Sequence, residues 1–311
     1  MCGNSASVTV LQCGVFLERL EISAQLSNAA TLHLFGIRHL CTLRIRFDPP
    51  SDTVIPSYDI FPSLESLILD NGVGYKWLSF LGTAQENGTT GRGLGTLEAG
   101  IRTTLRKLCC LGGTTVDSAF ISSLCIFRRL TYVFVDGLCS KEDGCTFLLT
   151  DYDVTKLADA LPDIKSLGLG SPCIANLCHT TPLCLFILST RCLKLKSLEI
   201  HFNTTNISHV LDQLFEEPKY ERMRSLPRCP LRYLAVADTP ISWRDIHTVA
   251  VRLSEVFHEL RGLRGNRRRW IDVSRQVLKF RNSIIFELII APARRTVSMI
   301  PHHPLVTVVE R

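Results

Sequence analysis

Apolar residues recur along the chain in a short pattern, L-x-x-L-x-L, in which isoleucine, valine or cysteine replaces leucine at some positions. The clearest copies are IKSLGL at 164–169 and LKSLEI at 195–200. Other copies begin at Leu17, Leu40, Leu64, Leu105, Leu130 and Leu231, and a weaker trace begins at Leu260. Because side chains alternate along a strand, each copy predicts a short strand with its aliphatic residues facing a core.

The segments between these copies have the features of amphipathic helices. In 154–161, for example, Val154, Leu157, Ala158 and Leu161 fall on one helical face before Pro162. Polar residues suited to capping precede the helical stretches. The predicted N-terminal caps are Asp117 or Ser118, Thr150 with Asp153, Thr181 followed by Pro182, Asn206, and Ser242 with Asp245.

A strand, a turn and a helix repeated in order indicate a leucine-rich-repeat solenoid. One such unit cannot cover its own apolar stripe, so neighbouring units stack and bury a continuous core. The sequence therefore predicts an irregular α/β solenoid, with parallel strands on the concave face and helices on the convex face. We expect residues 1–282 to form this domain, with a flexible glycine-rich insertion at 82–104, and residues 283–311 to form a tail or cap, in part disordered.

The bulk composition is that of a folded intracellular protein. The 311 residues are 46% apolar and 21% charged, with a formal net charge of +6. Thirteen irregularly spaced cysteines and the lack of a signal-like N-terminus predict free, buried thiols in a reducing compartment, the cytoplasm or nucleus. No apolar run reaches the ~18 residues of a membrane helix, so we expect no membrane partner.

The motifs of catalysis and of metal or cofactor binding are not evident. The best metal candidate gathers Cys173, Cys178, His179, Cys184 and Cys192, but it contains no C-x2-C pair. The chain has no G-x-S-x-G, and the glycines of the insertion do not form a phosphate-binding loop. We therefore predict a protein that is not an enzyme, without catalytic residues, cofactor or metal.

Basic residues cluster near the C-terminal end of the repeats. The cluster comprises Arg261, Arg264, Arg267, Arg268, Arg269, Arg275, Lys279 and Arg281. Nucleic-acid-binding proteins usually spread such charge along a face, so we interpret this local cluster as a solvated edge and expect no nucleic-acid partner.

The positions between the aliphatic residues of each strand are expected to face the concave solvent, where a protein target would bind. Tyrosine, arginine and other residues typical of binding hot spots occur there. The candidate partner-binding residues are Arg19, Glu21, Arg44, Arg46, Asp70, Tyr132, Phe134, Asp136, Glu199, His201 and Tyr233.

Three stretches resemble fungal F-box proteins with leucine-rich repeats. They are 150–173, the run CLKLKSLEIHFNTTNI at 192–207, and RSLPRCPLRYLAVADTPIS at 224–242, while WIDVSRQV at 270–277 is similar to the family's closing segment. The resemblance covers roughly 15–282. It implies the substrate receptor of an SCF-type ubiquitin ligase, in which an F-box binds a Skp-type adaptor and cullin, and the repeats hold the target.

The chain departs from that family at its N-terminal end. An F-box begins with a Leu-Pro dipeptide, and none precedes the first repeat. We expect the repeat domain without its adaptor-binding head, so adaptor and cullin are partners only if the full gene product contains an F-box. Two alternatives remain: a truncated repeat protein with no ligase link, and a hydrolase with an unrecognised Cys/His site.

Overall fold

The computed structural model is a succession of strands and helices with all described strands in one sheet. It describes residues 17–49, 60–83, 101–137, 147–170, 178–216, 218, 221, 225–236, 241–265 and 268–293. The nine strands are parallel and lie in chain order, each paired with the next one along the sequence. This is the irregular solenoid that the leucine pattern predicts.

The strands are short and evenly registered. They are β1 (Arg19–Ile22), β2 (Thr42–Ile45), β3 (Ser66–Leu69), β4 (Lys107–Cys110), β5 (Tyr132–Asp136), β6 (Ser166–Gly170), β7 (Ser197–Ile200), β8 (Tyr233–Ala235) and β9 (Gly262–Arg264). Each begins two residues after the first aliphatic residue of its sequence copy, so all nine predicted strands are confirmed, including the weak ninth one.

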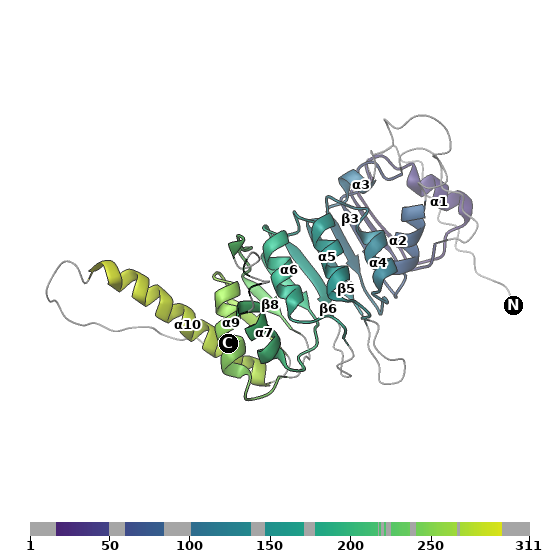
Figure 1. Ribbon diagram of the computed structural model, residues 1–311. Helices are drawn as coiled ribbons and strands as arrows, with labels where there is room; N and C mark the ends of the chain where they lie inside the picture. Colours follow the sequence, from purple (N-terminus) through teal and green to yellow (C-terminus); the bar gives the residue numbers. More distant parts are fainter. Residues whose placement is uncertain are drawn as a thin grey trace.

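Helices lie between most pairs of successive strands and cover one face of the sheet (Figure 1). They are α1 (Asn28–Phe35), α2 (Gly74–Thr83), α3 (Ile101–Thr104), α4 (Ser118–Leu124), α5 (Asp151–Ala160), α6 (Leu183–Arg191), α7 (Ile207–Glu216), α9 (Ile246–Val256) and α10 (Arg268–Ala293). The opposite face of the sheet, which is the concave one, carries none of these helices (Figure 1).

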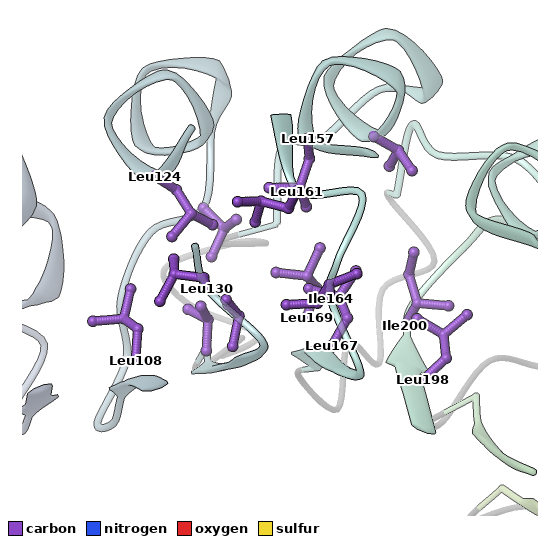
Figure 2. Close-up of a cluster of buried hydrophobic side chains, with 14 of the residues drawn as sticks. Leu108, Leu124, Leu130, Leu157, Leu161, Ile164, Leu167, Leu169, Leu198 and Ile200 are labelled. Atoms are coloured by element: carbon purple, nitrogen blue, oxygen red, sulfur yellow. The ribbon is translucent and has the colours of Figure 1, made fainter. Parts of the chain in front are cut away.

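The leucines of the repeat fill the space between the helices and the sheet. Figure 2 shows Leu108, Leu130 and Leu167 from the strand side meeting Leu124 and Leu157 from the helices. These side chains are almost fully buried and belong to one continuous core. Burying each such side chain contributes about 1.5–3 kcal/mol relative to leaving it exposed, and this repeated burial stabilises the stack.

Backbone hydrogen bonds also link neighbouring repeats, through the residue that immediately precedes each strand. The carbonyl oxygen of Arg106 accepts the amides of Thr131 and Tyr132 at 2.8 and 3.0 Å, and that of Lys165 accepts those of Lys196 and Ser197. The same shared acceptor recurs from Glu18 to Arg232. This continuous ladder fixes the register, so equivalent side chains of neighbouring repeats align across the concave face.

Most predicted helix starts agree with the structure. Thr150 and Asp153 form the expected reciprocal capping box, and the carboxylate of Asp117 accepts the amide of Phe120 at 2.8 Å. The predicted box of Ser242 and Asp245 is wrong. Asp245 is the N-cap of α9 but accepts from the Ser208 hydroxyl of the preceding repeat instead of its own helix.

Some predicted boundaries differ from those of the structure. Pro182 is the N-cap of α6 instead of its first residue, although the Thr181 hydroxyl accepts the amide of Leu183 at 3.2 Å as a cap does. Helix α10 runs through the boundary set at residue 282 and ends at Ala293. The insertion predicted at 82–104 is helical at both ends, in α2 and α3, and its remainder lies outside the described residues.

Candidate functional site

The concave face presents two parallel rows of side chains, because every second residue of each strand points away from the helices. The first row is Arg19, Thr42, Ser66, Lys107, Tyr132, Ser166, Ser197, Tyr233 and Gly262. The second row is Glu21, Arg44, Ile68, Cys109, Phe134, Gly168, Glu199, Ala235 and Arg264. Neighbours in a row lie about 4.8 Å apart, so their side chains interact directly.

Four charged residues at the N-terminal end of this face pair with one another; we refer to Glu21, Arg44, Arg46 and Asp70 as the paired cluster. Nε of Arg44 donates to Oδ2 of Asp70 at 2.7 Å, and Nε of Arg46 donates to the same oxygen at 3.1 Å. A terminal nitrogen of Arg46 lies 2.6 Å from a carboxylate oxygen of Glu21. Two cations and two anions therefore neutralise each other.

The prediction that Asp70 is exposed is wrong. It lies just past the end of β3 and is only 6% exposed. Both guanidinium groups converge on its carboxylate and cover it, which the alternation of strand residues alone does not reveal. Within the described residues its second oxygen, Oδ1, is buried without a hydrogen-bond partner.

A different arrangement occupies the middle of the face; we refer to Tyr132, Phe134, Asp136 and Glu199 as the central cluster. Phe134 of β5 lies across Gly168 of β6, where an added Cβ would meet the phenyl ring at 2.5 Å. The absence of a side chain at Gly168 lets the ring lie close to the sheet. The ammonium group of Lys107 lies 5.1 Å from the ring centroid of Tyr132, a cation–π distance.

Glu199 reaches the same strand from the other side. An added Cβ on Gly170 would meet its Oε1 at 2.4 Å, so the carboxylate lies over Gly170, which is registered with Asp136. Burial is the main cause that raises the pKa of Glu199; Arg264 lowers it and Asp136 raises it. Burial also raises the pKa of the Tyr132 hydroxyl, and Cys109 and Glu199 add to that rise.

Tyr233 marks the C-terminal side of the face. It is 58% exposed, and its ring lies beside Gly262, where an added Cβ would be 3.1 Å from Cδ1. Ser166 and Ser197 separate Tyr132 from Tyr233 in the first row. Two tyrosines thus flank a stretch of small hydroxyl side chains next to the central cluster.

His201 does not belong to the exposed face, so that prediction is wrong. It follows the last residue of β7 and is only 2% exposed. Its carbonyl oxygen accepts a hydrogen bond from the thiol of Cys178, which comes from the preceding repeat. Alternation would expose this residue, but past the strand end the chain of the neighbouring repeat covers it.

The structure thus brings eight of the candidate residues together in two clusters and leaves Arg19 and Tyr233 outside them. Glu21, Arg44, Arg46 and Asp70 come together, and so do Tyr132, Phe134, Asp136 and Glu199. Arg19 and Tyr233 lie toward opposite ends of the first row. The sequence interpretation missed Lys107, Gly168, Gly170 and Arg264, although the two glycines at concave positions of SLGLG were a signal that a neighbouring side chain approaches the backbone.

The cysteines behave as packed side chains in the part of the chain that the structure describes. Burial raises the pKa of Cys109, Cys125, Cys184, Cys192 and Cys229, and for Cys192 and Cys229 it raises it to about 12. A thiol with a raised pKa is a poor nucleophile at neutral pH. No metal-binding group of three His, Cys, Asp or Glu occurs among the described residues, and Cys173 lies outside them.

The basic residues near the C-terminal end are divided among different elements. Arg264 belongs to the second row of the concave face, Arg269 donates to the carbonyl oxygen of Ile241 at 2.7 Å, and Arg275 pairs with Asp272 at 3.1 Å. Arg267 lies outside the described residues, and the side chain of Arg281 does too. The cluster in sequence is therefore not one continuous surface through these three arginines.

Comparison with known proteins adds no assignment: no family model, curated protein or solved structure matches this chain. None of the helices in the described ranges combines the length and apolar character needed to cross a bilayer.

Proposed function

We propose that the protein is a non-catalytic interaction scaffold that holds a protein target on its concave face. The observation that carries this proposal is the composition of the uncovered side of the sheet. Tyrosine, phenylalanine and charged side chains occur among small residues there, at the positions that the repeat leaves free. Such residues supply most of the binding energy at protein interfaces.

The shape of the sheet supports the same proposal. The backbone ladder holds the rows in register over nine strands, so the face is formed before a partner arrives. A preformed surface loses little conformational entropy on binding, which favours affinity. The serine-containing stretch between Tyr132 and Tyr233 gives a partner chain access to the backbone level of the sheet.

The target-binding role fits the substrate receptor of an SCF-type ubiquitin ligase, the class that the sequence resembles. In this proposal the repeats recognise the protein to be ubiquitinated. A Skp-type adaptor and a cullin join only where the full gene product carries an F-box.

Affinity purification from the native cells tests the scaffold proposal. The tagged chain, Tyr132→Ala and Tyr233→Ala are compared by quantitative mass spectrometry. Loss of one side chain from a binding hot spot costs about 2 kcal/mol or more, so we expect the recovery of a true target to fall at least about tenfold.

Tyr152→Ala is the matched control, since Tyr152 is 76% exposed on helix α5, on the helical side of the sheet. The recovery of a target with the Tyr152→Ala variant should equal its recovery with the unmodified chain. Targets that survive both concave variants and disappear in Tyr152→Ala would place the binding surface on the helices and contradict the proposal. Adaptor and cullin among the recovered proteins test the ligase link separately.

A further inference from the structure

We infer that the central cluster receives a cationic side chain, arginine or lysine, from an extended basic segment of the protein partner. This inference rests on the proposed function and specifies the partner's chemistry. It concerns the Phe134 ring over Gly168, the Glu199 carboxylate over Gly170, and Asp136, which is registered with Gly170 and acts on Glu199 as a like charge.

The glycines bring these groups together from opposite sides. Phe134 lies over Gly168 from β5, and Glu199 lies over Gly170 from β7, as the contacts at 2.5 and 2.4 Å to added Cβ atoms show. A residue with a side chain at either position would hold them apart. An aromatic face and a carboxylate side by side offer a cation both a π surface and an ionic partner.

Within the described residues no ion pair neutralises the two carboxylates of this cluster. Asp136 acts on Glu199 as a like charge and raises its pKa, together with burial. The charge of Arg264 lowers the pKa of Glu199. Within the described residues, neither Arg264 nor any other cationic group forms an ion pair with Glu199 or Asp136. Lys107 lies over Tyr132. A cation brought by a partner supplies the missing counter-charge.

Other ligand classes fit this cluster less well. An anion would meet two carboxylates. A metal ion usually requires a third protein ligand, and no such group of three occurs in the described part of the chain. The paired cluster is no rival for a charged partner, because its arginines already bind Asp70 and Glu21 at 2.6–3.1 Å.

A peptide-display selection against the full chain tests the inference. The probes are random linear peptides of twelve residues displayed on phage, and enriched peptides are re-measured as synthetic peptides by titration calorimetry. We expect enrichment of an arginine or lysine whose replacement by norleucine weakens binding about tenfold. Glu199→Gln should weaken the parent peptide to a similar extent, and the two changes combined should be much less than additive.

Glu65→Gln is the matched control, because Glu65 is exposed at the edge next to β3 and the change removes the same charge. Its peptide affinity should remain within about twofold of the unmodified chain, since exposed charges at a distance are screened by salt. The affinity of the unmodified chain should also fall with rising salt more steeply than that of Glu199→Gln.

The outcomes separate the inference from the proposed function. The cation site is overturned if the peptides lose affinity for Tyr132→Ala or Tyr233→Ala but not for Glu199→Gln. It is also overturned if the peptides contain no arginine or lysine that binding requires. In both cases the proposed concave scaffold still stands. Peptides unaffected by all three concave variants overturn both. Peptides that require the cation, Glu199 and a flanking tyrosine support both.

Discussion

The paired cluster and the central cluster lie on the same face of one sheet, but their charged groups are arranged differently. In the paired cluster two arginines converge on Asp70, and Glu21 completes the set. In the central cluster Asp136 and Glu199 come together beside a phenyl ring without forming ion pairs within the described residues. The first group is internally neutral, whereas no ion pair neutralises the second within the part of the chain that the structure describes.

The comparison teaches how to distinguish charges that stabilise the fold from charges available to a partner. A buried carboxylate with its cations in place loses stability when one of them is removed, because the remaining charge is desolvated and unpaired. In a half-buried carboxylate beside a like charge, the ionised form is destabilised before any partner binds. The two clusters should therefore respond oppositely to loss of their central acid.

The largest effect is expected for Asp70→Asn. It removes the charge that both Arg44 and Arg46 contact at 2.7–3.1 Å, on a carboxylate that is itself buried. We expect the free energy of unfolding to fall by about 1.5–3 kcal/mol, the range for hydrogen bonds to charged groups. Urea denaturation followed by circular dichroism measures it, and an unchanged midpoint would contradict the structural role of this pair.

Gly168→Ala should have the next largest effect. The new methyl group would lie 2.5 Å from the Phe134 ring, so the ring or the strand must move. Overpacking of this kind lowers the free energy of unfolding by about 1–3 kcal/mol. The same denaturation experiment checks it, and full stability of the variant would show that Phe134 is free to leave the glycine surface.

Glu199→Gln should have a smaller effect of opposite sign at neutral pH. The pKa of this carboxyl is raised in the folded protein, so the folded state binds its proton more tightly than the unfolded state. Through this group stability rises as the pH falls from above the raised pKa, and the gain is complete below the ordinary value of 4.5. The variant should equal or exceed the parent at pH 7.

Comparing the denaturation midpoints of Glu199→Gln and the parent between pH 7 and pH 4 checks this prediction. The advantage of the variant should shrink as the parent carboxyl takes up its proton. An advantage that grows with acidification would mean that Glu199 is stabilised as an anion, as in the paired cluster, and would remove the distinction between the two clusters.

Gly170→Ala should have the smallest effect on stability. Its methyl group would meet Oε1 of Glu199 at 2.4 Å, but this atom is the far end of a flexible side chain and can swing aside. We expect the free energy of unfolding to change by no more than about 0.5 kcal/mol. A loss equal to that of Gly168→Ala would show that the Glu199 carboxylate is held as firmly as the Phe134 ring.

Much of the fold was predictable because its signal is local. The last two aliphatic residues of each copy alternate as in a strand, and Asp117, Thr150 and Asp153 mark helix starts through contacts within three residues. Where a cap depends on another repeat the prediction was wrong: Asp245 accepts from Ser208, 37 positions away in the sequence.

The candidate site was less predictable for the same reason. Alternation correctly placed Tyr132, Phe134 and Tyr233 on the concave rows. It could not show that Asp70 would be covered by two arginines or that His201 would be buried past the end of its strand. It also gave no role to Gly168 and Gly170, whose meaning depends on side chains from β5 and β7.

The sequence by itself determined the strands, their order and the face that each residue within a strand takes, because aliphatic spacing and backbone pairing follow from the chain's own periodicity. Only the tertiary structure decided which charged groups pair with one another. Arg44 and Arg46 lie 26 and 24 positions away from Asp70 in the sequence, and no spacing within one repeat encodes such a pairing.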